Sequence, residues 1–270
     1  MFRRFKLLAI GLTLLALCAA PLTGKAAALE DDKNVTAEAV AELVVYAYGT
    51  RPGLAQVRRY GVERGRLTRV TNEGRTEEAT YELRFVRGES SDKDKVRLDQ
   101  KSPTVEYSLV YGNGRTWGLV NGAAFTPRQE ATEDFVAQMR HGVDVLLRYK
   151  EDGSTINYVG RDKKMGLDLY VLDLTDKEKL RTRYYISTKT GRVLWLEYEQ
   201  TPAGGSKPVK YLRKFYDYRI VQGTLVPYRT VLYEDGKQTQ EARVMTVTYG
   251  VKMEDSLFQN PETPATAAQP

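Results

Sequence analysis

The chain has 270 residues, a formal net charge of +6, one histidine and one cysteine. Four of the basic residues and no acidic residue lie within positions 1–28, so the remaining 37 basic and 35 acidic residues leave a net charge of only +2. No long Lys/Arg run occurs beyond that point, which argues against a nucleic-acid-binding protein.

Residues 1–28 have the organisation of a secretory signal peptide. Basic residues within the first six positions precede an apolar run over 7–20, and Ala26 and Ala28 supply the small residues of a cleavage site after Ala28. The apolar run is shorter than the about 20 residues that a membrane-spanning helix needs, so a membrane anchor is the weaker alternative. We expect an exported protein.

Cys18 raises a second alternative, lipid attachment at a lipoprotein-type cleavage site. The preceding Leu15, Ala16 and Leu17 put a bulky leucine where such a site requires a small residue, so lipid attachment is less favoured. If Cys18 leaves with the signal peptide, the mature chain contains no cysteine. Disulfides and cysteine-based zinc sites are then excluded.

The first predicted element is a helix over residues 36–48. Thr36 can cap it, and apolar residues recur behind Thr36 at helical spacing until a glycine and a proline end the pattern. After this helix, apolar and polar residues alternate with a period of two, as in β-strands. Residues 54–70 predict a long charged strand, or a strand pair that turns near Arg64 and Gly65.

Short alternating segments joined by turns follow, and they predict antiparallel neighbours rather than βαβ units. These segments cover residues 79–86, 95–100, 104–111, 115–120, 155–160, 167–174, 181–188 and 192–200. The stretch "FYDYRIVQGTLVPYRTVLYEDGKQTQEARVMTVTYG" (215–250) adds three more strands separated by two turns. The total is roughly eleven strands.

A second helical pattern interrupts the strands over residues 126–149. Pro127 suits the start of a helix, and apolar residues from Phe135 to Leu147 fall on one stripe. Gly142 weakens the middle of this pattern, so a break in the helix is expected there.

These elements predict an α+β fold in which one strongly curved antiparallel sheet carries the helices on its concave face. A two-sheet sandwich is the alternative, but it leaves the apolar stripes of the helices without a partner. We expect residues 29–259 to form a single domain. Residues 260–270 are rich in Pro, Ala and Thr and predict a disordered tail.

Three segments carry a resemblance to a known family. "YYISTKTGRVLWLEYEQ" is similar to a hairpin with a Thr-Gly turn, and "FYDYRIVQGTLVPYRTVLYEDGK" to a pattern of aromatic–Asp–aromatic, Gly, Val-Pro and a Gly turn. "MEDSLFQNP" looks like a short Asp-Ser-Leu-Phe segment that ends many such chains. Together they resemble the LolA/LolB-like superfamily of periplasmic outer-membrane lipoprotein carriers. The likeness covers roughly residues 184–261 by motif and most of the mature chain by architecture.

The resemblance implies an unclosed β-barrel with a helical lid over a hydrophobic cavity. Members of the superfamily hold lipoprotein acyl chains in transit between the inner and outer membranes, which implies a handover protein at each membrane. The superfamily also uses an arginine on an early strand to hold the lid shut by hydrogen bonding. No motif selects among the four arginines available here, which are Arg58, Arg59, Arg64 and Arg66.

Apolar residues on the inward positions of the strands are the candidate acyl-chain-binding residues. They are Tyr81, Leu83, Phe85, Tyr107, Leu109, Leu167, Leu169, Val171, Leu194 and Leu196. The plainer interpretation is ordinary core beneath the helices. Burying one long acyl chain contributes on the order of 10 kcal/mol gross, at about 0.8 kcal/mol per methylene.

Nothing in the sequence indicates catalysis, a metal site or a cofactor. His141 has no cysteine partner and no acidic residue at helical spacing, so we expect a half-exposed helix residue. No Gly-x-Ser-x-Gly motif occurs. Residues 112–118 favour a hairpin turn over a phosphate loop. Glu77, Glu78 and residues 92–94 are expected to be solvated turns.

The sequence therefore predicts a non-enzymatic periplasmic carrier that binds lipoprotein acyl chains or another lipid in a hydrophobic cavity. The alternative is an envelope sensor or scaffold of the same fold that binds a protein partner through strand edges or its charged face.

Overall fold

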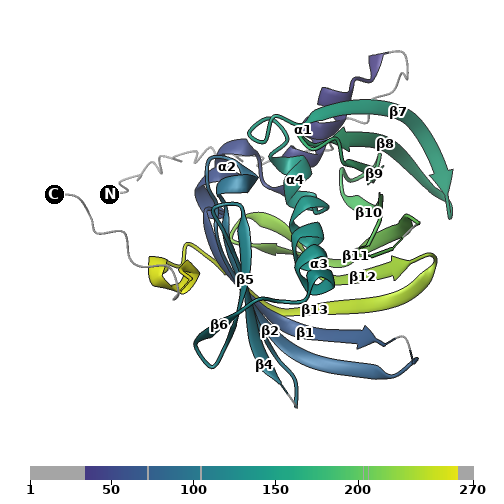
Figure 1. The fold of residues 1–270 in the computed structure, drawn as a ribbon. Helices are drawn as coiled ribbons and strands as arrows, with labels where there is room; N and C mark the ends of the chain where they lie inside the picture. Colours follow the sequence, from purple (N-terminus) through teal and green to yellow (C-terminus); the bar gives the residue numbers. More distant parts are fainter. Residues whose placement is uncertain (1–33, 72, 104, 203, 206, 261–270) are drawn as a thin grey trace, which may run out of the picture.

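A computed structural model describes residues 34–260 apart from 72, 104, 203 and 206. The expected signal peptide, Cys18 and residues 261–270 of the expected tail lie outside the described residues. One antiparallel sheet of thirteen strands dominates the structure (Figure 1). Within the part that is described, no helix combines the length and the apolar character needed to cross a membrane.

The strands follow one another in two meanders separated by helices. They are β1 (Tyr60–Val70), β2 (Thr76–Val86), β3 (Lys95–Lys101), β4 (Glu106–Gly112), β5 (Arg115–Val120), β6 (Ala123–Phe125), β7 (Thr155–Lys164), β8 (Leu167–Thr175), β9 (Arg181–Ser187), β10 (Val193–Gln200), β11 (Val209–Val221), β12 (Thr224–Glu234) and β13 (Lys237–Tyr249). The helices are α1 (Ala37–Tyr48), α2 (Arg51–Val57), α3 (Gln129–Arg140) and α4 (Val143–Leu147), and short 3₁₀ turns are η2 (Ser91–Lys93) and η3 (Asp255–Phe258).

The order of strands in the sheet is β6-β5-β4-β3-β2-β1-β13-β12-β11-β10-β9-β8-β7. Pairing of β1 with β13 joins the two meanders, while β6 and β7 form the two edges and do not pair with each other. The predicted curved antiparallel sheet, open as a barrel, is thereby confirmed, and the two-sheet sandwich is wrong. The sheet exceeds the roughly eleven expected strands partly because β6 has only three residues, too few to show an alternating pattern.

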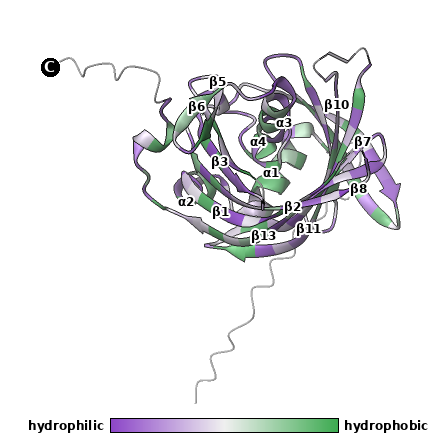
Figure 2. Cartoon of the chain, turned by 60° about the horizontal axis from the view of Figure 1, so that its bottom comes forward, coloured by the Kyte–Doolittle hydropathy of each residue, from purple (hydrophilic) through white to green (hydrophobic). Residues whose placement is uncertain are grey.

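The sheet curls around the helices, so that α1, α3 and α4 lie inside its concave side (Figure 2). Helix α1 begins as the sequence predicts, because the Thr36 hydroxyl accepts a hydrogen bond from the amide of Ala39 at 3.1 Å. One face of α1, including the fully buried Val40 and Val44, packs with α4 and the concave side of β8–β12 into the main core. This half of the barrel is therefore solidly filled.

The segment between α1 and β1 differs from its prediction. Residues 51–57 form α2, with Pro52 in the first turn, where its missing N–H costs nothing. This proline was expected at the end of the first helix, but it lies at the start of the second. Arg64 and Gly65 do not turn the chain either. They lie within one continuous β1, opposite a β-bulge at Met245 of β13.

The second helical pattern breaks where Gly142 predicts it should. Helix α3 ends at Arg140, His141 is its C-terminal cap, and Gly142 caps the start of α4 in an extended conformation. After β13 the chain crosses to the convex face, where Phe258 of η3 is buried with Val110 and Leu119. The "DSLF" segment thus covers the outer side of β4 and β5.

Candidate functional site

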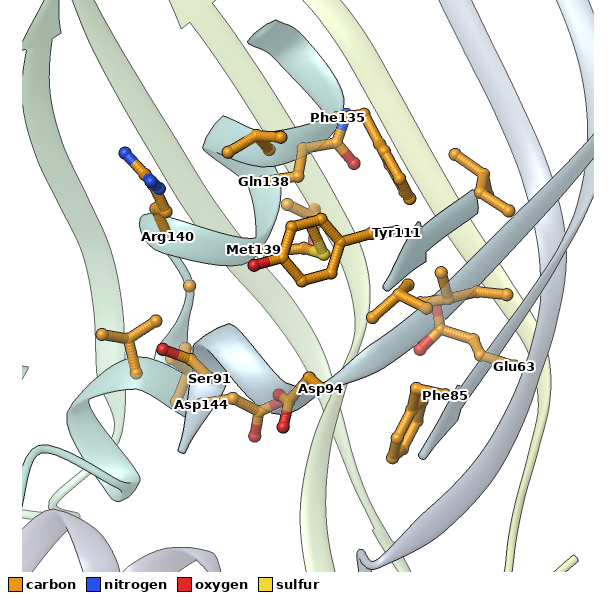
Figure 3. A pocket seen from close by; sticks show the side chains of 18 of the residues that line it. Glu63, Phe85, Ser91, Asp94, Tyr111, Phe135, Gln138, Met139, Arg140 and Asp144 are labelled. Atoms are coloured by element: carbon orange, nitrogen blue, oxygen red, sulfur yellow. The ribbon is translucent and has the colours of Figure 1, made fainter. Parts of the chain in front are cut away.

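A cavity of about 540 Å³ lies between the concave face of the sheet and helices α3 and α4. Its walls come from β1–β4 on one side and β11–β13 on the other, and Figure 3 shows side chains of both helices pointing into it. This volume falls within the range of small-molecule binding pockets, which are mostly apolar with a few convergent polar groups. The cavity has an apolar wall and a charged end, which are described in turn.

The apolar wall is built where the alternation of β2, β3 and β4 turns one row of side chains inward. Tyr81, Leu83 and Phe85 of β2 pack with the inward rows of β3 and β4, and Phe135 of α3 lies against them. Met139 contacts the same cluster one turn further along α3 (Figure 3). Aromatic and aliphatic surfaces of this kind suit an acyl chain better than a polar metabolite.

Helix α3 covers this wall more loosely than α4 covers the main core. In α3 only Phe135 and Ala137 are buried, whereas every residue of α4 except Asp144 is buried. Helix α3 is therefore less firmly packed than α4, and moving α3 away from the sheet would break fewer buried contacts.

The charged end of the cavity centres on Asp144 of α4. Its carboxylate pairs with Arg58 at 2.9 Å and with Arg87 at 2.5 Å. The Asp144 side chain is 48% exposed, and it lines the cavity (Figure 3). Although burial opposes ionisation, Arg87 and Arg58 hold the pKa of Asp144 well below its usual range.

Arg58 ties α4 to the sheet. Besides Asp144, its guanidinium donates to the hydroxyl of Thr224 at 3.3 Å and to the carbonyl of Leu225 at 2.5 Å. Of the four candidate arginines, Arg58 is buried, whereas the other three are exposed. Arg58 is also the one that bonds a helix of the cover, and it lies at the end of α2 rather than on a strand.

A second ionic contact holds the C-terminal end of α4. Arg148 pairs with Asp94 at 2.7 Å and donates to the carbonyl of Gly88 at 3.0 Å, while Asp152 accepts from the amide of Ser91 at 2.7 Å. The prediction that residues 92–94 form a solvated turn is wrong for Asp94, because its side chain is only 16% exposed. The turn is docked to the helix instead.

His141 is buried rather than half-exposed, which corrects its prediction. Its Nδ1 lies 2.6 Å from the hydroxyl of Thr182, and its ring stacks on Tyr198 with centroids 3.8 Å apart. Arg213 donates to the carbonyls of His141 and Gln138, the unpaired end of α3. The contacts of His141 and Arg213 therefore hold the C-terminal end of α3 against the sheet, next to Gly142.

Burial, with Arg213 and Arg140 nearby, lowers the pKa of His141 to about 3. In the unfolded chain the imidazole titrates at about 6.5, so below that pH unfolding takes up a proton and the folded state loses stability. We expect the free energy of unfolding of the wild type to fall by about 2 kcal/mol relative to a His141→Phe variant between pH 7 and pH 5. Urea unfolding at both pH values measures this difference.

The protonation of His141 can be followed directly by NMR, because the chain has one histidine. The ring signals of His141 in NMR spectra should show no titration between pH 8 and pH 5. A midpoint near 6.5 would contradict the buried, neutral imidazole.

The described residues contain no group of three or more His, Cys, Asp and Glu side chains placed to bind a metal ion. The arginines and carboxylates at the charged end are mutually paired, and no nucleophile–base pair lies among the groups described above.

The structure brings only part of the predicted acyl-binding set to the cavity. Tyr81, Leu83 and Phe85 line it. Tyr107 and Leu109 lie on the same concave face and belong to the adjoining apolar cluster, where Leu109 faces Leu98 across β3–β4. Their placement is consistent with the prediction, and their contact with a ligand stays a prediction.

The remaining members lie elsewhere. Leu196 is fully buried in the main core under α1. The others fall on the opposite, convex face: Leu169, Val171 and Leu194 pack in a separate cluster with Tyr185 and Trp195, and Leu167 is 43% exposed. On β8 the residues that face the helices are Tyr170, Leu172 and Leu174. The assignment of Leu167, Leu169, Val171 and Leu194 to the inward face is therefore wrong.

Sequence reasoning missed the polar groups of the cavity, above all Glu63, Arg87 and Asp144. Their pairing depends on contacts between segments far apart in the chain, such as Arg58 with Asp144. Glu63 does carry a local signal, since it alternates with Gly61 and Gly65 on β1, so that a charged side chain stands between two glycines on the inward face.

Comparisons with known proteins identify the architecture. No protein-family model matches the sequence, and no curated protein matches it. Among solved structures, a DUF1329 family protein from Desulfovibrio piger has a TM-score of 0.57 at 13% identity, covering 83% of this chain and 97% of that chain. A LolA superfamily protein from Nitrosomonas europaea has a TM-score of 0.57 at 10% identity, covering 83% and 98%.

A third solved structure, an outer membrane lipoprotein-sorting protein domain from Vibrio parahaemolyticus, has a TM-score of 0.53 at 12% identity, covering 74% of this chain and 88% of that domain. At these identities the likeness concerns the fold. The chain has a LolA-like fold, as the resemblance of its C-terminal segments implies.

Proposed function

We propose that this LolA-like chain is a non-enzymatic periplasmic carrier that holds the acyl chains of a lipoprotein or another lipid in the cavity beneath α3. The observation that carries the proposal is an apolar wall of Tyr81, Leu83 and Phe85 that is covered by Phe135 of α3, a helix with only two buried residues. Residues 1–28 would direct export and then be cleaved, and delivery would use a handover protein at each membrane.

The balance of energies suits a carrier. Each methylene of a bound chain contributes about 0.8 kcal/mol by leaving water. Displacing α3 costs the contacts of Phe135 and Met139 with the wall, and displacing α4 costs the ion pairs of Asp144. Binding is thereby weakened below the gross value of burial, which a protein that must release its ligand requires.

The experiment that tests this function measures lipid directly. Protein purified from its native envelope should carry a co-purifying lipid in native mass spectrometry, and the delipidated protein should bind a fluorescent fatty-acyl probe. A delipidated, folded sample that binds no such probe would refute the carrier function.

A second candidate, a sensor or scaffold that binds a protein partner, has one observation in its favour. Strand β7 is a ten-residue edge of the sheet with alternating exposed side chains, and an extended peptide could pair with its free backbone. Cavity-blocking substitutions separate the two functions, because they would leave pairing at β7 unchanged.

A further inference from the structure

Glu63 is a carboxyl group set into the apolar part of the cavity. On β1 it faces Leu83 of β2 on one side and Val247 of β13 on the other, and all three side chains line the cavity. Figure 3 shows Glu63 and Phe85 on neighbouring strands at the same side of the pocket. A polar group in such a position is costly unless something bonds to it.

The two glycines beside Glu63 shape this position. A Cβ atom on Gly61 would lie 2.4 Å from the ring of Phe85, and one on Gly65 would lie 2.7 Å from the ring of Tyr81. Both rings therefore occupy space that any larger residue would take, and they lie over the strand on either side of Glu63. Two aromatic rings and two aliphatic side chains thus surround one carboxyl group.

Only one oxygen of Glu63 has a partner in the described residues. The hydroxyl of Tyr81 donates to Oε1 at 2.7 Å. No Lys or Arg of the described part of the chain forms an ion pair with Glu63, and the nearby Arg58 is committed to Asp144, Thr224 and Leu225. Burial raises the pKa of Glu63, with the Tyr81 bond and Arg58 opposing it and the negative charge of Asp144 adding to it.

A neutral carboxyl group has one O–H to donate. With Oε1 accepting from Tyr81, that donor is Oε2, which forms no hydrogen bond with a described residue although Glu63 lines the cavity. A ligand in the cavity can therefore supply the acceptor. In an acyl lipid the group that follows the chain is the carbonyl of its ester or amide.

We propose that Glu63 donates a hydrogen bond to the carbonyl that joins the acyl chain of the ligand to its headgroup. This inference rests on the proposed carrier function and narrows it to acyl-linked lipids. The rings of Tyr81 and Phe85 hold the chain beside Glu63, and the carbonyl fixes how far the chain enters. A ligand with the same chain but no carbonyl would leave the Glu63 donor unpaired.

The test compares two lipids of equal chain length, a 1-monoacylglycerol with its ester carbonyl and the matching 1-alkylglycerol ether without one. Each competes with a fluorescent fatty-acyl probe for the delipidated protein. The wild type should bind the ester up to about tenfold more tightly than the ether. Glu63→Leu should abolish that preference, while Glu63→Gln should keep it, because an amide can donate to the carbonyl and accept from Tyr81.

Glu78→Leu is the matched control, since Glu78 is an exposed glutamate on β2 whose side chain alternates away from the row of Tyr81 and Leu83. It should leave the preference unchanged. Probe binding itself shows that each variant is folded.

Three outcomes would overturn the proposal. Equal affinity of the wild type for ester and ether, or a preference that survives Glu63→Leu, would refute the contact with the carbonyl and leave the carrier function standing. Tight binding of a long-chain alkylammonium that is lost in Glu63→Gln reassigns Glu63 to an ionised partner for a cation. Absence of any probe binding by the wild type refutes the carrier function, and this inference with it.

Discussion

Leu83→Trp is expected to lower the affinity of the delipidated protein for a fatty-acyl probe at least tenfold, a loss of about 1.4 kcal/mol or more. Leu83 lines the cavity from the middle of β2, between Tyr81 and Phe85. The larger indole would extend into open space rather than into packed side chains. The free energy of unfolding should therefore change by less than about 1 kcal/mol, below the usual cost of overpacking a filled core.

Leu167→Trp provides the control. Leu167 belongs to the same predicted acyl-binding set, but it is 43% exposed on the convex face, so this substitution should leave probe binding unchanged. Fluorescence titration of both variants, with thermal unfolding alongside, makes the comparison. Equal affinities for the two variants would contradict a ligand site on the concave face.

The second large effect is expected at the charged end of the cavity. Arg58→Ala should lower the free energy of unfolding by about 3 kcal/mol, because it removes a buried guanidinium that pairs with Asp144 and bonds two further acceptors, and Arg87 alone then remains beside Asp144. The Arg58 side chain is 8% exposed, and its loss would leave Thr224 and the carbonyl of Leu225 without this donor. Denaturant unfolding measures the change.

Two companion variants test the geometry. Arg59 follows Arg58 in the chain but is exposed, so Arg59→Ala should change the free energy of unfolding by no more than about 0.5 kcal/mol. Arg58→Lys should recover little, since a single ammonium cannot replace a planar guanidinium that reaches three acceptors. Full recovery by lysine would show that charge alone matters at this position.

The same contact predicts a dependence on pH. The folded pKa of Asp144 is depressed, so its ionisation stabilises the fold above the unfolded value of about 3.9 and this contribution is lost as the pH falls through the folded pKa. The stability difference between wild type and Arg58→Ala should accordingly be largest at neutral pH and shrink in acid.

Local signals predicted the helices of the main core well. Thr36 as a cap, the apolar stripe of α1 and the break at Gly142 all act within a few residues, and the structure confirms them. The curved sheet was also predictable, because the strands alternate and the helices need a concave partner. Local reasoning failed at Pro52, whose fixed backbone suits a helix start as well as a helix end.

Which row of β8 side chains points toward the helices could not be derived from the sequence of the strand. "LDLYVLDL" is apolar at both parities, and Leu169 and Tyr170 are both buried on opposite faces of the sheet. Period two then carries no information about which row faces the helices. The charged end of the cavity could not be predicted for another reason, because the partners of Arg58 lie 86, 166 and 167 residues further along the chain.

The free strands at the two ends of the sheet have a mechanical consequence. A closed cylinder has its circumference fixed by strand number and stagger. Here β6 and β7 do not meet, so small adjustments of twist, spread over twelve strand pairs, can tighten or relax the whole curl without breaking any inter-strand bond. In the proposed carrier the interior would therefore grow or shrink with the girth of the ligand, and this elasticity would reside in the sheet as well as in the helices that cover it.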